Sequence, residues 1–321
     1  MPNYSRLTRE QRYTIEAMNR NGANQNEIAT AIGKHPSTVS RELGRLGRDT
    51  AYCFAAAHRH AEERWSGGKC ADQTLLALAE TRIRDEQWSP QQVSAWLVRQ
   101  DHGRLSHETI YQHVYRDKAA GGDLHTHLRH RYKPYRKRGS ERERRGRLKD
   151  QVMIDDRPAV VDERSRIGDW EMDTVIGKVG GPVLVTMVER FSRFTLIALA
   201  ASKDATAVGT AILEAMGPQR DKVLTTTYDN GKEFALHKLL GDILQADAYF
   251  AHPYHSWERG LNENTNGLIR QYFPKGMDFT KVTHAEIAAV ELKLNRRPRK
   301  CLDYQTPNDI FNPLPTRALA A

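Results

Sequence analysis

Apolar residues recur at helical spacing in the first 120 residues of this 321-residue chain, and at strand spacing beyond residue 155. Near the beginning, two short amphipathic segments flank Gly33, and Pro36 suits the first turn of the second segment. The apolar positions that would face a common core are Ile28, Ala29, Ile32, Val39 and Leu43. This pattern predicts a helix-turn-helix within a first domain over residues 1–50.

The polar positions of the second helix would lie on its outer face. They are Ser37, Thr38, Ser40 and Arg41. Hydroxyls and a guanidinium on such a face can reach phosphates and base edges in a DNA major groove. We expect Ser40 and Arg41 to read bases, although an ordinary helical hairpin with a solvated polar face has the same local pattern.

A similar pattern returns between residues 70 and 120. A supporting amphipathic segment is followed by Ser89 and Pro90, which suit a helix start, and Ser106 would cap another helix after a turn at Gly103. The outward-facing residues of that last helix are Thr109, Gln112, His113 and Arg116. Two such units in series favour a bipartite DNA-binding region over two unrelated hairpins.

Beyond residue 155 the pattern changes from helices to strands. Three runs alternate as strands do, and helical and strand patterns then alternate with each other. The order βββαβαβα predicts an α/β domain of RNase H-like fold over residues 156–315, with a mixed five-stranded sheet and helices on both faces. The chain is therefore expected to be multidomain, with an all-α helix-turn-helix region before the α/β domain.

Carboxylates collect on the first of these predicted strands. Alternation along the strand places Trp170 and Met172 on one face and Asp169, Glu171 and Asp173 on the other. The first face suits a core and the second suits a polar site. Alternation alone does not choose among the three acids.

Two further acids complete a candidate metal site. Asp229 stands where a strand ends and an Asn-Gly turn begins, and Glu263 lies on the polar side of a helix predicted over residues 256–273. The polar stripe also holds Arg259, Asn266 and Arg270, which we expect to contact DNA, and the apolar stripe holds Trp257, Leu261, Leu268 and Tyr272. Carboxylate oxygens suit a hard cation such as Mg²⁺, and paired metal ions catalyse phosphodiester displacement.

The excess of positive over negative charge lies entirely in the first half of the chain. Residues 1–150 hold 28 Lys/Arg and 18 Asp/Glu, a net charge of +10, whereas residues 151–321 hold 21 and 22, a net charge of −1. Such asymmetry indicates a module that binds a polyanion. A basic linker or arm is predicted over residues 121–155, although a merely solvated linker has a similar composition. The residues of the arm that we expect to contact phosphates are Arg136, Lys137 and Arg138.

Other features of the sequence exclude several classes of protein. Three cysteines are too few for a disulfide framework or a four-ligand zinc site. The beginning of the chain lacks the apolar core of a signal peptide, and there is no uninterrupted apolar run of about 18 residues. We therefore expect a cytoplasmic, nucleoid-associated protein.

Three segments resemble the catalytic motifs of a known family. The segments GDWEMDTVIG, TYDNGKEF and HSWERGLNENTNGLIRQYFPKG resemble those of bacterial DDE transposases of the insertion-sequence-thirty family, whose cores are RNase H-like and integrase-type. The terminal NRRPRKCLDYQTPNDIF is similar to the closing signature of integrase-type cores. By this resemblance Asp173, rather than Asp169 or Glu171, forms the catalytic triad with Asp229 and Glu263.

The resemblance implies an insertion-sequence DNA transposase that binds terminal inverted repeats and catalyses metal-dependent strand cleavage and strand transfer. Asp173 and Asp229 would hold one of two Mg²⁺ or Mn²⁺ ions and, with Glu263, the other. Water attack would free a 3′ hydroxyl at the element end, and that hydroxyl would attack target DNA or the opposite end. The implied partners are the terminal repeats, target DNA and further copies of the chain, in a homodimer or a larger synaptic assembly.

Two other functions remain open at this point. A DNA-binding regulator without enzymatic activity would account for the first 120 residues, but it has no need of Asp173, Asp229 and Glu263. A nuclease that cuts DNA without joining strands would use the same carboxylates.

Overall fold

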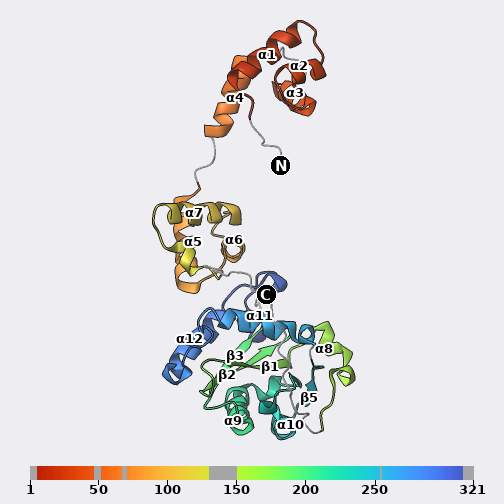
Figure 1. Ribbon diagram of the computed structural model, residues 1–321, viewed down its shortest axis with the longest axis vertical. Helices are drawn as coiled ribbons and strands as arrows, with labels where there is room; N and C mark the ends of the chain where they lie inside the picture. Colours follow the sequence, from red (N-terminus) through yellow and green to blue (C-terminus); the bar gives the residue numbers. More distant parts are fainter. Residues whose placement is uncertain (1–5, 47–51, 67–70, 130–149, 254, 314–321) are drawn as a thin grey trace, which may run out of the picture. The chain divides into compact units, whose positions relative to one another are not determined.

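The computed structural model describes two compact units, residues 1–71 and residues 72–321 (Figure 1). Within them, the described residues are all except 1–5, 47–51, 67–70, 130–149, 254 and 314–321.

The first unit contains four α-helices among its described residues. They are α1 (Arg9–Arg20), α2 (Gln25–Ala31), α3 (Pro36–Leu43) and α4 (Phe54–Ser66). Thr8 and Asn24 form capping boxes at the first two helices, and the His35 side chain accepts from the Ser37 backbone at the start of the third. Gly33 adopts a φ of +63°, which favours glycine. The predicted pair of helices around Gly33 is confirmed.

A shared core holds these four helices together. Ile15, Ile28 and Val39 are completely buried, and Tyr52 and Ala57 close the core from the fourth helix and the residues before it. A buried ion pair at 2.7 Å joins Arg12 of α1 to Glu42 of α3. The sequence pattern did not predict α4, which packs against α1.

The second unit begins with α5 (Gln73–Glu86), α6 (Pro90–Arg99) and α7 (His107–Ala119). Asp72, Ser89 and Ser106 accept hydrogen bonds from backbone N–H groups in the first turns of these helices. The predicted caps and helices of this segment are confirmed. The fully or almost fully buried side chains between them are Ile83, Val93, Leu97, Ile110 and Val114.

A five-stranded sheet follows. Its strands are β1 (Asp169–Ile176), β2 (Val183–Glu189), β3 (Thr195–Ala200), β4 (Thr225–Tyr228) and β5 (Asp247–Phe250). They lie in the order β3-β2-β1-β4-β5, with antiparallel pairing from β1 through β3 and parallel pairing of β1 with β4 and of β4 with β5. The predicted mixed sheet with an antiparallel meander is confirmed, and it places the end of β4 beside the middle of β1.

Helices cover both faces of this sheet (Figure 1). On one face, α9 (Ala205–Met216) and α10 (His237–Leu244) contribute to a core that includes Trp170 and Met172. On the other face, α11 (Gly260–Ile269) and α12 (His284–Asn295) enclose a core that includes Val175 and Leu184. The RNase H-like arrangement predicted from the element order is therefore present.

Several short helices complete the described part of the chain. The α-helices are α8 (Ala159–Glu163) and α13 (Pro307–Phe311). The 3₁₀ helices are η1 (Gly44–Leu46), η2 (Leu124–His127), η3 (Ile154–Asp156), η4 (Gly217–Lys222), η5 (Lys232–Phe234), η6 (Ser256–Arg259), η7 (Phe279–Lys281) and η8 (Lys300–Leu302). Among the described residues, no helix is both long enough and apolar enough to cross a membrane.

The helix predicted over residues 256–273 is wrong at both ends, since α11 ends at Ile269 and residues 270–273 form turns. Residues 256–259 form the 3₁₀ helix η6, and the α-helix begins at Gly260. A 3₁₀ turn has three residues, so the apolar stripe of α11 does not continue back to Trp257. Leu261 and Leu268 are buried as predicted, whereas the Trp257 residue is 70% exposed.

Candidate active site

Asp169, the first of the three acids on β1, is buried and forms an ion pair with the partly exposed Arg166. Both of its carboxylate oxygens accept from Arg166 at 3.0 Å, and Oδ1 also accepts from the Thr225 hydroxyl at 2.8 Å. The residue is buried. Asp169 therefore ties β1 to β4 and has no free face for a substrate.

Glu171 is equally enclosed. It forms an ion pair with Arg190, and its Oε2 accepts from the backbone N–H of Asn262 on α11 at 3.3 Å. The exposed fraction of Glu171 is 0%. This acid fastens α11 to the sheet, so its contacts are those of a structural residue.

Asp173 differs from both, because its side chain is only partly buried and faces other acids. Its Oδ1 accepts from the Thr174 N–H at 2.9 Å, and its Oδ2 accepts from the Asn266 amide at 2.8 Å. The Asn266 carbonyl in turn accepts from the Thr186 hydroxyl at 3.1 Å. This second bond orients the amide so that its nitrogen, rather than its oxygen, faces Asp173.

Asp229 follows the last residue of β4, beside β1 in the sheet. Its Oδ1 accepts from the Gly231 N–H at 2.8 Å. A Cβ at Gly231 would lie 2.7 Å from this oxygen and closer still to Oε2 of Glu233. Glycine at this position therefore allows the turn to approach both carboxylates.

One guanidinium lies between Asp173 and Asp229. The Arg259 nitrogens are 3.7 Å from Oδ1 of Asp173 and 3.6 Å from Oδ2 of Asp229, and Nη1 donates to the Met172 carbonyl at 3.2 Å. Burial raises the pKa of the Asp173 carboxyl, the Arg259 charge opposes this, and the nearby Asp229 charge adds to it. The two aspartates thus form a negative site that already accepts a cation.

Sequence reasoning missed Glu233, which lies in η5 beside this pair. The Glu233 carboxylate accepts from the Thr174 hydroxyl at 3.1 Å and pairs with Lys203 at 3.1 Å. Its charge contributes to raising the pKa of Asp173. Its position two residues after the Asn-Gly turn was the available signal, because that turn also carries Asp229.

Glu263 lies on the exposed side of α11. The neighbouring Asn262 bonds through its backbone to Glu171, and Asn266, three residues further on, bonds to Asp173. Residues three apart share a face of a helix, so Glu263 and Asn266 lie on the same side of α11. Within the described residues, however, Asp173, Asp229 and Glu263 do not form a group in which one oxygen of each lies within 4.8 Å of the other two.

The donor set fits a hard divalent cation. Asp173 and Asp229 offer only oxygen atoms, which Mg²⁺ and Mn²⁺ prefer, and they already face a positive guanidinium. Asp173 lies within β1 and Asp229 directly follows the neighbouring strand β4, so the sheet holds the two carboxylates together. The structure therefore brings two of the three predicted ligands together.

The predicted DNA-contacting residues of the first unit lie on α3. Ser40 and Arg41 are exposed, as a base-reading surface requires. Ser37 and Thr38 are partly buried, and the Ser37 hydroxyl is 2.9 Å from Nδ1 of His35.

The corresponding residues of α7 differ in their accessibility. Gln112 and Arg116 are exposed. The Thr109 hydroxyl is 2.8 Å from that of Ser106, and Nε2 of His113 is 2.7 Å from the Glu80 carboxylate. His113 thus already has a partner within the protein.

The remaining predicted DNA contacts fall into two groups. Arg270 donates to the Ile176 carbonyl at 2.8 Å, so this end of its side chain is held against β1. Arg136, Lys137 and Arg138 lie outside the described residues.

A sheet of this order, with one acid within β1, one directly after the adjacent strand β4 and one on the later helix α11, is typical of the class of DDE polynucleotidyl transferases. Comparison with known proteins agrees. The helix-turn-helix domain family matches residues 3–46, and the integrase core domain family matches residues 164–256. The integrase core implies an active site that depends on divalent metal ions.

Full-length relatives define the family more closely. The transposase for insertion sequence element IS4351 of Bacteroides fragilis is 41% identical, over 95% of this chain and 95% of that protein. The transposase for element IS1086 of Cupriavidus metallidurans is 35% identical, over 96% and 94%. The transposase InsI for element IS30A of Escherichia coli K12 is 35% identical, over 88% and 77%. The chain belongs to this IS30 family of insertion-sequence transposases, and it binds DNA.

Proposed function

We propose that this protein mobilises its own insertion sequence by binding the terminal inverted repeats, cleaving the element ends and joining them to target DNA. The observation that carries this proposal is the convergence of Asp173 and Asp229 around a single cationic group. The family membership supports the same reaction. We further propose that the protein acts in the cytoplasm, on the nucleoid.

Asp173, Asp229 and Glu263 are proposed to hold two Mg²⁺ or Mn²⁺ ions. Such ions activate the attacking hydroxyl and stabilise the leaving oxygen during phosphodiester displacement. Asn266 is proposed as a positioning residue, because its amide holds Oδ2 of Asp173 while Oδ1 lies on the side of Arg259. Glu263 completes the site when DNA and metal ions bring α11 and the aspartates closer together.

Arg259 has a second proposed role. In the described structure its guanidinium neutralises the two aspartates at 3.6–3.7 Å, distances too long for strong hydrogen bonds. Once the aspartates bind metal ions, this guanidinium is released to contact a DNA phosphate. Arg259 therefore remains a predicted DNA contact, one that pairs with the carboxylates until metal ions bind.

The division of labour along the chain is also a proposal. Residues 1–50 and 70–120 are proposed to read separate DNA sites, residues 121–155 to contact phosphates, and residues 156–315 to carry out catalysis. Exposed Ser40, Arg41 and Arg116 are the side chains best placed for DNA contact. Because two element ends must be held together, we propose a homodimer or larger assembly as the active form.

The test uses the full chain and the DNA that flanks its gene. Matched inverted repeats there define the substrate, and we expect the protein to nick this DNA at the 3′ end of the element in Mg²⁺ or Mn²⁺. A precut end with a free 3′ hydroxyl should then be joined to target DNA. Cleavage without joining would indicate a nuclease, and specific binding with neither reaction would indicate a regulator.

A further inference from the structure

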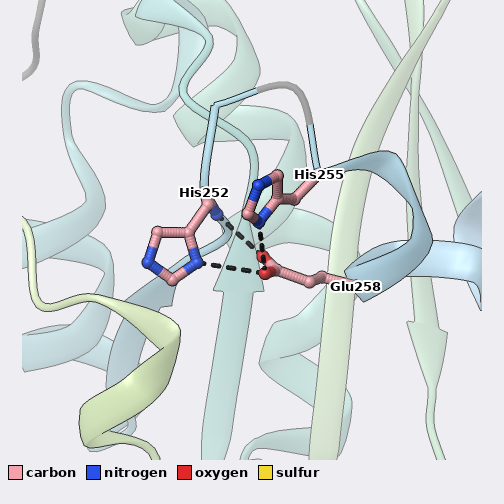
Figure 2. Close-up of side chains that lie close together, drawn as sticks. All are labelled: His252, His255 and Glu258. Carbon is pink, nitrogen blue, oxygen red and sulfur yellow. Dashed lines mark hydrogen bonds and ion pairs between the residues drawn. The ribbon is translucent and has the colours of Figure 1, made fainter.

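Two histidines and one glutamate converge beside the active site. Figure 2 shows the imidazoles of His252 and His255 turned toward the carboxylate of Glu258. The Nδ1 atoms of both histidines lie 3.0 Å from the same oxygen, Oε1 of Glu258. One ligand atom from each of the three residues lies within 4.8 Å of the other two, which no other group of three such residues achieves in the described part of the chain.

The backbone places these side chains together. His252 follows β5, and its N–H donates to Oε2 of Glu258 at 2.8 Å. His255 precedes η6 and Glu258 lies within it, three residues later. Side chains three residues apart are eclipsed in a 3₁₀ turn, so the backbone itself brings the side chains of His255 and Glu258 together.

An acidic residue from another segment contacts the far side of His252. Nε2 of His252 is 3.0 Å from Oδ2 of Asp155 in η3. The chain near η3 is held beside β5, because the Phe250 N–H donates to the Val152 carbonyl at 2.9 Å. Metal-ligating histidines usually donate the N–H of their second ring nitrogen to a carboxylate, a backbone carbonyl or water.

We propose that His252, His255 and Glu258 form a binding site for a transition-metal ion such as Zn²⁺ or Co²⁺. The ligands are the two Nδ1 atoms and one oxygen of Glu258, and water supplies the remaining coordination. Zn–N distances of about 2.0–2.1 Å at tetrahedral angles separate neighbouring ligands by roughly 3.3 Å. The observed 3.0 Å from each Nδ1 to Oε1 of Glu258 is close to this separation.

The proton balance agrees with this assignment. His252 donates from both nitrogens, to Glu258 and to Asp155, so it loses only its Nδ1 proton to solvent when Nδ1 binds the ion, and its Nε2–H stays hydrogen-bonded to Asp155. His255 gives up its Nδ1 proton and takes one up on Nε2 from solvent, so both imidazoles bind in their neutral form.

The site formed by His252, His255 and Glu258 differs from the DDE site in its ligand atoms and in the part of the chain that a bound ion would hold. Its two nitrogen ligands favour Zn²⁺ or Co²⁺, whereas the all-oxygen aspartates favour Mg²⁺ or Mn²⁺. Glu258 directly precedes Arg259, whose guanidinium lies between the catalytic aspartates. An ion held here would fix η6 and thereby the starting position of Arg259.

The test measures Zn²⁺ binding by the full chain, by titration calorimetry and by metal analysis after gel filtration, with excess Mg²⁺ present. We expect one Zn²⁺ per chain in the wild type and at least about 100-fold weaker binding in His255→Ala and Glu258→Gln. Asp155→Asn removes only the outer partner of His252, so it should weaken binding by about 10–100-fold. Co²⁺ should give the visible absorption of a mixed nitrogen and oxygen site.

Two control variants separate this site from others. His284→Ala removes an exposed histidine on α12, and Asp229→Asn removes a ligand of the DDE site. Both should bind Zn²⁺ as the wild type does. Absence of Zn²⁺ binding in the wild type would overturn the proposal. So would unchanged affinity in His255→Ala and Glu258→Gln, or equal losses in the two controls.

Discussion

Glu171 and Asp173 stand two residues apart on one strand, yet amide substitution should affect them in opposite ways. Glu171→Gln removes the charge that faces Arg190 in the interior, where the exposed fraction of Glu171 is 0%. Removing one partner of a buried ion pair typically costs about 3–5 kcal/mol, because the other charge stays buried without compensation. We expect the lower end of this range, because Arg190 also pairs with the 61% exposed side chain of Asp162.

A loss of about 3 kcal/mol corresponds to a decrease in Tm of about 6–12 °C for a domain of this size. Asp173→Asn should behave differently. Burial raises the pKa of Asp173, which means that the folded state favours the neutral carboxyl. Ionisation of Asp173 therefore lowers the stability of the folded state at pH values above that pKa. The neutral amide should therefore leave the Tm at neutral pH unchanged or slightly higher.

Thermal unfolding followed by circular dichroism, in EDTA at neutral pH, measures both effects. The double variant Glu171→Gln with Arg190→Gln is the matched control, since it leaves no uncompensated charge and should recover part of the lost stability. A Tm within about 2 °C of the wild type for Glu171→Gln would refute the reasoning. A double variant less stable than either single variant would also refute it.

Other substitutions test DNA recognition and the site geometry. Arg41→Ala should reduce discrimination between specific and random DNA by about 1–3 kcal/mol in competition binding, and equal losses on both would make Arg41 a phosphate-binding residue. Neutralising Arg136, Lys137 and Arg138 should weaken binding to all DNA sequences. The slope of log K against log salt should become shallower by about 0.9 for each phosphate contact that is lost. An unchanged slope would show that these residues do not contact phosphates. Gly231→Ala would place a Cβ 2.7 Å from Oδ1 of Asp229, a proposed metal ligand, so it should abolish cleavage while end binding survives. Full cleavage activity would contradict this placement.

Local sequence signals predicted most of the elements. Thr8, Asn24, Ser89 and Ser106 cap helices where the polar-to-apolar pattern changes, and these contacts span at most three residues. Strand alternation likewise placed Trp170 in the core.

Some helices were not predicted from the sequence. The position of α4 depends on packing against α1, far earlier in the chain. The helix α12 begins with a capping box of Thr283 and Glu286, but its position also depends on long-range contacts. Its Asn295 accepts from the Thr195 N–H and its Glu291 from the Ile197 N–H, about 100 and 94 residues away.

In the candidate site, too, local sequence signals predicted some features and long-range contacts determine the others. Periodicity placed three acids on one face of β1, but their separation into structural and catalytic acids depends on distant partners. Asp169 meets Thr225, 56 residues later, and Glu171 meets Arg190, 19 residues later. Asp173 was selected by family resemblance, and its lack of such a buried ion pair now gives a physical reason for that choice.

The contacts of Arg259 and Asn266 could not be read from the sequence. Both lie on a polar stripe, which predicted exposure to DNA. In the structure both face Asp173, across 86 and 93 residues of chain. Helical spacing defines which residues share a face, but it does not say what that face meets.

The central claim is that Asp173, Asp229 and Glu263 form the catalytic triad. Strand transfer from a precut element end tests it most directly, with binding to the same DNA measured in parallel. We expect the variants Asp173→Asn, Asp229→Asn and Glu263→Gln to bind the precut element end but not to join it to target DNA in Mg²⁺ or Mn²⁺. Asp169→Asn and Glu171→Gln should retain measurable joining at a temperature where they remain folded. Normal joining by Asp173→Asn, together with a folded but inactive Asp169→Asn, would show that Asp169 belongs to the triad in place of Asp173.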